Sequence, residues 1–414
     1  MSESQNLLFV TVDCLRQDFT ANDWATTPFI DDLRESGIEY QELYSTTTTT
    51  TPSVASLLTG TYSERNGVNS LRNVELNEQV RTMAESFREA GFETAALVTG
   101  PLVEETGISR GFDHFNYRDK DMNLVDDWYE EAVSHLNSLS SPFFMYLHLW
   151  EIHTPVTVPP EYDNQKYGKS PYARGLSALD GRLEQFVKET PKNTTVVLHG
   201  DHGESISWRE HLVQKGCKKL RDKARYEFGL DTRSLERLAN RLLDPFSPPY
   251  KDHFIESGHG ETILDFMTNV PFILSGPNIE PETVSAQCRQ VDILPTLLDV
   301  FDLPLASKID GQSLLPPESV DDRTAYIRAC GASLRGESNW QRGVRTPEYK
   351  YVEYPNRDWG PELFDLTDDK TELRNVASAH PETLSELQNQ LPTQELLDVG
   401  SMDIDDHLRD LGYL

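Results

Sequence analysis

Short apolar runs separated by helical patterns recur along the chain up to Gly276. Runs that are apolar throughout are typical of strands buried on both faces of a parallel sheet. The segments between them, such as TPFIDDLRESG and VRTMAESFREAG, have helical periodicity. This alternation predicts an α/β sandwich with a mostly parallel central sheet and helices on both faces. The expected strands are Asn6–Asp13, Thr94–Gly100, Phe143–Leu149, Thr194–Gly200 and Val270–Gly276.

The pattern of expected elements changes after about Leu305, where short strand-like runs, turns and one helical pattern follow one another. We therefore expect a larger α/β domain over residues 1–305. A smaller C-terminal α+β subdomain, with antiparallel strands and a terminal helix, is expected over residues 306–414.

Charge and targeting patterns narrow the class of protein. Against 38 Lys and Arg stand 68 Asp and Glu, a formal net charge of −30. Such a surface repels nucleic acid, and an acidic, lysine-poor composition suggests a salt-adapted, halophilic cytoplasm.

No apolar run approaches the roughly 20 residues of a membrane span, and the start MSESQNLLFVTVD lacks a signal-peptide pattern. The four cysteines are scattered along the chain without zinc-like spacing: Cys14, Cys217, Cys288 and Cys330. Together with the targeting pattern, this predicts a reduced, cytoplasmic protein.

Polar side chains follow four of the expected strands. In an open parallel sheet, ligands bind outside the carboxyl ends of the strands. One acid after a strand is more often a turn or helix-capping residue, but several at one edge indicate a site. The residues are Asp13, Thr99, Glu151, His153, Asp201 and His202.

The run LHGDHGES, Leu198–Ser205, is the sharpest local signal. Its glycines allow tight turns, so Asp201 and His202 can face one cation. Carboxylate and imidazole suit a divalent metal, and Asp13 would add negative charge. On its own the run could equally be a surface turn with a helix cap.

Six threonines precede a short apolar helix pattern in STTTTTTPSVASLLTG, Ser45–Gly60. Pro52 suits the first helical position, with Thr51 as cap and Gly60 as terminator. Thr50 would then lie at a helix N-terminus, where unpaired N–H groups favour an anion. A hydroxyl held there on a metal would be acidified into a nucleophile. The alternative interpretation is a low-complexity spacer.

Ten motifs stand in the same order as in a known family and cover nearly the whole chain. On these motifs the chain resembles the sulfatase branch of the alkaline-phosphatase superfamily. The resemblance implies an alkaline-phosphatase-like sandwich fold and hydrolysis of sulfuric or phosphoric esters. The motifs are LLFVTVDCLRQD, TTPSVASLLTGTY, TMAESFREAGFETAALV, RGFDHF, HLWEIHTP, HGDHGE, GHGETILDFMTNVPFILSGP, VDILPTLLDV, GVRTPEYKYVEY and ELFDLTDDKTELRNVA.

The resemblance also implies roles for individual residues. One divalent metal ion would be held by Asp13, Thr50, Asp201 and His202, with Thr50 as the nucleophile. His153 and His259 would contact the transferred group or protonate the leaving oxygen, and Thr99 falls where relatives often have a substrate-binding lysine. Oxygen-rich ligands favour Ca²⁺, Mg²⁺ or Mn²⁺, and Zn²⁺ is also admissible.

Several positions depart from the family pattern. Most sulfatases oxidise a Cys or Ser to formylglycine, a route closed to Thr50, and the arginine that follows four residues later in relatives is Val54 here. Cys14 replaces a second aspartate, which removes one anion. Two-metal relatives place an acid four residues before a histidine; the residue four before His153 is Leu149, so we expect a single metal.

The chemistry of Thr50 leaves the substrate open between sulfate esters and phosphate monoesters, diesters or phosphonates. A formylglycine hydrate can release sulfate by collapsing at carbon, whereas a threonine ester must be hydrolysed. The expected substrate is an anionic small molecule or glycan ester. Two alternatives remain at this point: a catalytically degenerate binding protein, and a transferase of phospho groups to a glycan or lipid.

Residues 205–258 separate two motifs that commonly lie closer together in relatives. From Arg209 to Arg241 this segment carries ten Lys or Arg against five Asp or Glu, a local charge of +5. Because both ends are tethered to site motifs, we expect an inserted basic lid that selects anionic substrates. The alternative is an amphipathic helix pair whose charges pair with the acidic body.

Overall fold

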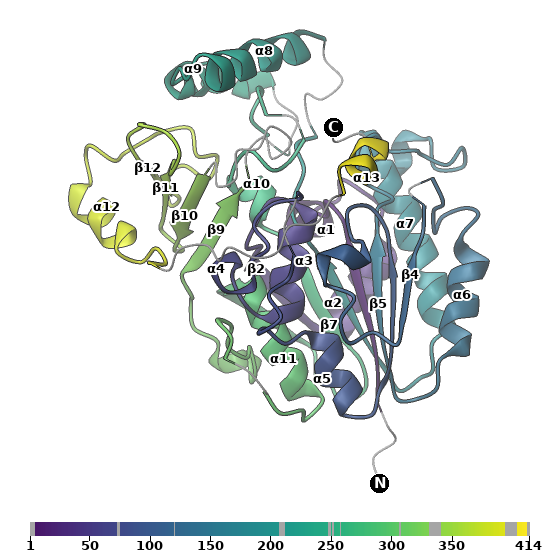
Figure 1. The fold of residues 1–414 in the computed structure, drawn as a ribbon. Helices are drawn as coiled ribbons and strands as arrows, with labels where there is room; N and C mark the ends of the chain where they lie inside the picture. The colour runs from purple at the N-terminus through teal and green to yellow at the C-terminus, as the bar shows by residue number, and fades with distance from the viewer. Residues whose placement is uncertain are drawn as a thin grey trace.

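The computed structural model describes most of the chain (Figure 1). A large sheet lies between two layers of helices, and a smaller sheet lies beside it. The described residues are 5–72, 75–119, 121–206, 212–246, 250, 252–256, 258–305, 308–330, 341–393 and 404–411.

The large sheet has the strand order β4-β3-β5-β1-β6-β7-β2-β8. All its pairings are parallel except those of β7, which runs antiparallel to both neighbours. The mostly parallel α/β sheet is therefore confirmed. Its strands are β1 (Asn6–Val12), β2 (Ile38–Tyr44), β3 (Glu93–Val98), β4 (His114–Tyr117), β5 (Phe143–Leu149), β6 (Thr194–Gly200), β7 (Phe272–Ser275) and β8 (Glu282–Arg289).

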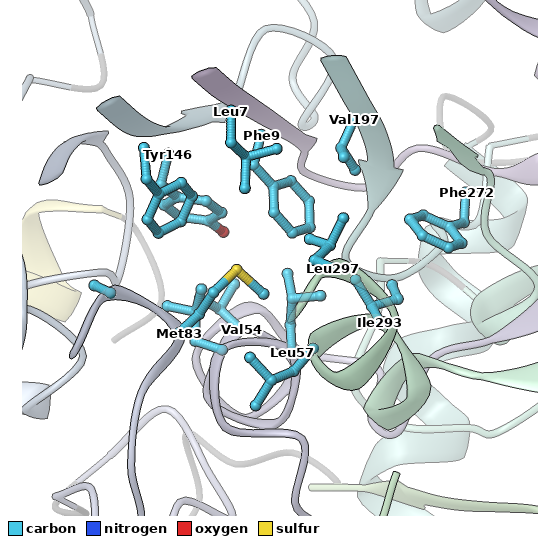
Figure 2. Packing of buried hydrophobic residues seen from close by; sticks show 14 of the residues in the cluster. Leu7, Phe9, Val54, Leu57, Met83, Tyr146, Val197, Phe272, Ile293 and Leu297 are labelled. Atoms are coloured by element: carbon cyan, nitrogen blue, oxygen red, sulfur yellow. The ribbon is translucent and has the colours of Figure 1, made fainter. Parts of the chain in front are cut away.

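Both faces of this sheet are buried. Successive side chains of β1 point to opposite sides, so they enter two different cores. Leu7 and Phe9 lie in a core with helices α3, α5 and α11 (Figure 2). Leu8 and Val10 lie in a second core with helices α2, α6 and α7. The helices are α1 (Gln17–Thr20), α2 (Pro28–Ser36), α3 (Thr50–Thr59), α4 (Ser63–Asn66), α5 (Met83–Glu89), α6 (Tyr129–Ser138), α7 (Pro171–Lys188), α10 (Asp265–Thr268) and α11 (Ile293–Val300). Short 3₁₀ turns are η1 (Glu104–Thr106), η2 (Gln165–Tyr167), η5 (Gln290–Asp292) and η6 (Pro317–Ser319).

The second sheet is antiparallel, with the order β12-β11-β10-β9, and helix α12 (Pro381–Gln388) packs on it. Helix α13 (Asp405–Asp410) lies instead against the α/β domain, where Leu408 contacts Leu71 and Asp405 pairs with Arg72. The last helix therefore belongs with the α/β domain by its contacts. The strands are β9 (Ala325–Ala329), β10 (Gln341–Arg345), β11 (Tyr349–Glu353) and β12 (Glu362–Asp365).

The inserted segment contains two antiparallel helices, which Figure 1 shows in teal at the top of the molecule. They are α8 (Leu212–Asp222), extended by a π-helical turn η3 (Lys223–Glu227), and α9 (Arg233–Leu243), followed by η4 (Asp244–Phe246). We call residues 212–246 the α8–α9 arm. Within the described residues, no helix combines the length and apolar character that a membrane span requires.

The start of α2 gives a stability prediction. Its N-cap Thr27 makes no side-chain capping bond, and the carboxylate of Asp180, from α7, accepts from Phe29 N–H at 3.1 Å and Ile30 N–H at 2.9 Å instead. We expect Asp180→Ala to lower the free energy of unfolding by about 1–3 kcal/mol, because two helix N–H groups lose their acceptor. Chemical denaturation measures this, and Asp32→Ala on the exposed face of α2 is the control.

The pH dependence of this effect has a definite sign. Burial raises the pKa of Asp180 to about 7, although the two backbone hydrogen bonds oppose the rise. A carboxyl whose folded pKa is raised contributes most below its unfolded pKa near 4, and this contribution is lost as pH rises through 7. The difference between wild type and Asp180→Ala should therefore be larger at pH 4.5 than at pH 8. A difference that grows with pH would contradict the assignment.

Candidate active site

The structure brings the four expected metal ligands together at the carboxyl ends of β1 and β6. These strands are parallel neighbours, with Val12 beside Gly200, so Asp13 and Asp201 leave the same edge of the sheet. Thr50, at the start of α3, donates a hydrogen bond from Oγ1 to Asp13 Oδ2 at 3.0 Å. Its Oγ1 also lies 3.3 Å from His202 Nε2. All four side chains are buried.

Helix α3 begins at Thr50, two residues earlier than the sequence pattern predicts. Thr49, not Thr51, is the N-cap, and Ser53 N–H donates to Thr49 O at 3.2 Å. Pro52 fits in the first turn because N–H groups there have no partner within the helix. Gly60 ends the helix in the left-handed conformation (φ 63°), as expected. The N-terminus of α3 therefore lies at the hydroxyl of Thr50 itself.

The six threonines are an ordered part of the core, not a spacer, and all are buried. Their hydroxyls have different surroundings: Thr46 contacts Gln290, Thr49 contacts Cys330 Sγ, and Thr48 Oγ1 has no hydrogen-bond partner. Of these six side chains, Thr50 is the one whose hydroxyl contacts Asp13.

Gln290 fixes the start of α3 against the end of β6. Its Oε1 accepts from Thr46 N–H at 3.1 Å, and its Nε2 lies 2.8 Å from Ser53 Oγ. Ser53 Oγ in turn donates to the carbonyl of Asp201 at 2.6 Å. This network links the start of α3, where Thr50 lies, to the backbone of Asp201. The sequence analysis did not single out Gln290.

His148 is a further site residue that the sequence analysis missed. It lies in β5, next to β1, and its Nε2 is 3.9 Å from both Asp13 Oδ2 and Asp201 Oδ2. The side chain is fully buried, and neither ring nitrogen has a hydrogen-bond partner. The available signal was a histidine inside an otherwise apolar strand, which is more often read as part of the core.

The buried donor atoms fit a divalent cation. Asp201 Oδ2 is buried without a hydrogen-bond partner. One donor atom each from Asp13, His148 and Asp201 all lie within 4.8 Å of one another, and so do those of Asp13, Cys14 and His202. Ligand distances of roughly 2.0–2.6 Å place donors on opposite sides of one ion at such separations.

The electrostatic surroundings of the two carboxylates differ. Burial, followed by the charge of Asp201, raises the pKa of Asp13 to about 6. Burial also acts to raise the pKa of Asp201, but the charges of His202 and His148 outweigh it and hold that pKa below its usual value. His202 Nδ1 donates to the carbonyl of Gly203 at 2.9 Å, which leaves Nε2 as the nitrogen facing Thr50.

Cys14 acts as a hydrogen-bond donor within this cluster. Its backbone is left-handed (φ 65°), which directs its N–H to Asp201 Oδ1 at 3.1 Å, and its Sγ donates to Asp13 Oδ1 at 2.8 Å. Burial, reinforced by Asp13, raises the pKa of this thiol well above its usual value. Through its N–H and its thiol, Cys14 orients both carboxylates.

His153 and His259 lie side by side next to His202. Their Nε2 atoms are 3.3 Å apart, and the ring of His259 packs on that of His202 with centroids 4.4 Å apart. His259 Nδ1 donates to Thr48 O at 3.3 Å, so its Nε2 faces His153. Both side chains are partly exposed, and His153 lines a cavity of about 290 Å³ with Trp150 and Thr154.

Two strand-end residues take other positions. Glu151 pairs with the buried Arg118 at 2.8 Å and accepts from Leu124 N–H at 2.7 Å, so it supports a loop. Thr99 is buried after β3, and no contact recorded for the described residues joins it to the carboxylate cluster. A substrate-binding role for Thr99 stays a prediction.

The profile of the family described as "Sulfatase" matches residues 5–303. The chain belongs to the sulfatase family. A second profile, "N-sulphoglucosamine sulphohydrolase, C-terminal", matches residues 262–399 of the chain.

The curated relatives of this chain are distant. Arylsulfatase K of Gallus gallus is 25% identical over 69% of this chain and 57% of the relative. The chain thus spans little more than half the length of that relative. Delta 4,5-hexuronate-2-O-sulfatase of Bacteroides thetaiotaomicron is 23% identical over 91% of this chain and 85% of the relative.

Solved structures share the fold. A 2-O GAG sulfatase superposes with a TM-score of 0.67 at 20% identity, over 99% of this chain and 92% of the other. The phosphonate monoester hydrolase of Agrobacterium radiobacter superposes with a TM-score of 0.68 at 17% identity, over 96% and 99%.

Proposed function

We propose that this sulfatase-family protein is a metal-dependent hydrolase of sulfate esters, with Thr50 as its nucleophile. The observation that carries the proposal is the position of Thr50 Oγ1, which lies at a buried helix N-terminus between Asp13 and His202. Asp13, Thr50, Asp201 and His202 would hold one divalent cation, with His148 within reach. A bound cation would neutralise the two carboxylates and lower the pKa of the threonine hydroxyl.

The protein's own groups prepare Thr50 for attack. The hydrogen bond from Oγ1 to Asp13 Oδ2 turns the hydroxyl proton toward a carboxylate. The free N–H groups at the start of α3 favour the negative charge that develops on the transferred group. Attack forms a bond from Oγ1 to sulfur and breaks the bond from sulfur to the departing alcohol oxygen. Water then hydrolyses the threonine ester and restores the hydroxyl.

His153 and His259 are placed to supply the proton that the departing alcohol takes up. Their facing Nε2 atoms, 3.3 Å apart, lie on the partly exposed side of the cluster. A proton held by either Nε2 can be given to a leaving oxygen and regained from the attacking water.

Val54 supports a mechanism without formylglycine. Val54 is fully buried in the core with Leu57 and Met83 (Figure 2). The position four residues after Thr50 therefore carries no positively charged side chain that could stabilise an aldehyde hydrate. Because a threonine ester needs hydrolysis at the transferred atom, phosphate esters and phosphonates are the second substrate class. The fold similarity to a phosphonate monoester hydrolase agrees with this.

The named relatives favour an anionic glycan as the physiological substrate. One curated relative is a hexuronate-2-O-sulfatase, and one structural neighbour is a 2-O GAG sulfatase. The second imidazole, from His148, makes the donor set less oxygen-rich than the sequence indicated, which strengthens Mn²⁺ and Zn²⁺ relative to Ca²⁺ and Mg²⁺ among the four candidate cations. The salt-adapted cytoplasmic setting stays a prediction.

A substrate panel tests the proposal. The protein is assayed with p-nitrophenyl sulfate, p-nitrophenyl phosphate, bis(p-nitrophenyl) phosphate and p-nitrophenyl phenylphosphonate, each with the four cations in turn. We expect cation-dependent turnover, fastest with the sulfate ester. If the protein binds cations but turns over none of these esters, the degenerate binding protein is the better interpretation.

The leaving group should reveal the role of the histidine pair. We expect His259→Ala to slow the hydrolysis of esters of poorly acidic alcohols by about 10²–10⁴-fold. The hydrolysis of p-nitrophenyl esters should slow much less, because p-nitrophenolate leaves without a proton. His135→Ala on the outer helix α6 is the control. An equal loss for all leaving groups would assign His259 to binding of the transferred group.

A further inference from the structure

The α8–α9 arm carries an extended apolar surface. Eleven large apolar side chains are exposed among the described residues, and nine of them belong to the arm. Every one of the nine is more than half exposed. Monomeric proteins rarely leave contiguous apolar patches of more than a few hundred Å² in water. The nine are Leu212, Val213, Leu220, Phe228, Leu230, Leu235, Leu238, Leu242 and Phe246.

The polar face of the arm, not its apolar face, points toward the body. Arg221 is buried and pairs with Glu256 at 3.2 Å and Glu261 at 2.8 Å. Arg233 is also buried and pairs with Glu362 of β12 at 3.3 Å. Turning the leucines inward would break these buried pairs and leave charges uncompensated. The apolar face is therefore held outward.

These ion pairs also bear on the predicted basic lid. The arginines pair with acids next to the second sheet, as the alternative interpretation required, and their charge is thereby neutralised. The selection of anionic substrates by this segment remains untested. The ion pairs do not explain the exposed apolar side chains on the outward face of the arm.

The spacing of the exposed residues fits a helix-packing seam. Leu235, Leu238 and Leu242 of α9 follow the alternating three- and four-residue interval of coiled coils. On α8, Leu212, Gly216 and Leu220 repeat every four residues, and a Cβ added at Gly216 would meet no atom within 4 Å. The small residue permits a close approach by another helix. The seam thus fits a second pair of helices in a four-helix arrangement.

We propose that the occupant is the same arm of a second copy of this chain, related by a two-fold axis. A standard interface buries about 800 Å² per partner, and nine large, more than half-exposed side chains present an area of that order. A two-fold interface needs a surface that complements itself, and an apolar seam does so. The main alternative is an anionic lipid surface, which the net charge of −30 opposes and the local excess of Lys and Arg in the arm favours.

The charges at the rim complement each other in an antiparallel pairing. Exposed lysines Lys215 and Lys219 lie along α8, whereas the exposed acids lie at the turn between the helices. Of these acids, Glu227 lies 3.9 Å from Lys223, and Asp231 pairs with Arg233 at 2.7 Å. An antiparallel two-fold pairing brings the lysines of one copy toward the acids of the other. Because both acids already have partners within one copy, these contacts only bias the direction of packing, and the leucines provide the affinity.

Two strongly acidic bodies repel each other, so salt should strengthen this dimer. Screening reduces the repulsion between copies of charge −30, while apolar contacts persist. A complex formed with anionic lipid through the lysines would weaken with salt. The salt response therefore separates the two occupants.

Sedimentation of the full chain tests the proposal. The wild type should be a dimer that tightens from 0.1 to 2 M salt. Leu220→Lys combined with Leu238→Lys should raise the dissociation constant at least about 100-fold, with unchanged Tm and p-nitrophenyl ester turnover. Leu212→Lys with Leu235→Lys should repeat the effect. The matched control is Leu305→Lys, an exposed leucine outside the arm, which should remain dimeric.

Two outcomes would overturn the proposal. One is a wild type that stays monomeric at every salt and protein concentration, whether or not it co-sediments with phosphatidylglycerol vesicles. The other is a lysine double variant that folds and dimerises like the wild type.

Discussion

Replacing Thr50 by alanine should lower kcat by at least about 10³-fold, because removal of a nucleophile typically costs 10³–10⁶ in rate. Its hydroxyl is the one of the six threonines that contacts Asp13, at 3.0 Å. Thr50→Ser retains a hydroxyl and should recover part of the rate. Steady-state kinetics on the best ester of the panel provides the measurement.

The neighbouring threonine supplies a matched control. The hydroxyl of Thr48 is buried without a hydrogen-bond partner, so Thr48→Ala removes no bond. We expect Thr48→Ala to keep most of the wild-type kcat and a similar Tm. Equal losses in Thr48→Ala and Thr50→Ala would mean that packing of the threonine segment, and not the chemistry of Thr50, had been disturbed.

Removing divalent cations should destabilise the protein and abolish turnover. Without a cation, the buried carboxylates of Asp13 and Asp201 lie close together, and burial with their mutual repulsion raises the pKa of Asp13. A ligand at 100 times its Kd stabilises the folded state by about 2.7 kcal/mol. Dialysis against a chelator should therefore lower Tm by several degrees, and the correct cation should restore it.

Variants separate the cation site from general effects on stability. Asp201→Asn removes one of the two facing charges, so its Tm should no longer respond to added cation. His148→Phe should weaken cation binding by about 10–100-fold in calorimetry if its imidazole supports the ligands. Asp113→Asn, an acid outside the cluster that accepts from Thr94 N–H, should keep the full response. A cation response that survives in Asp201→Asn would contradict the proposed site.

Much of the fold and of the candidate site could be predicted from the sequence. The apolar runs ending in Asp13 and Asp201 became the adjacent strands β1 and β6, because fully buried parallel strands need apolar residues on both faces. The polar residue after each run reached the same sheet edge because parallel strands end together. The prediction of Thr50 as nucleophile came from the family motif that the chain resembles, in which the reactive residue lies two positions before the proline, Pro52 here.

Other features depended on which elements became neighbours. His148 looks like a core residue in the sequence, and its approach to Asp13 and Asp201 exists only because β5 pairs with β1. Glu151 follows the same strand, yet Arg118 draws it away from the cluster. Strand periodicity says nothing about such partners.

The sequence by itself determined the alternation of elements, the strand-end carboxylates and the amphipathic character of the α8–α9 arm, since these follow from local periodicity. Only the tertiary structure decided which residue of the threonine run begins α3 and which face of the arm points outward. Helix starts depend on partners such as Gln290, and the orientation of the arm depends on the acids that Arg221 and Arg233 reach. Such partners lie far apart along the chain, so local pattern cannot reveal them.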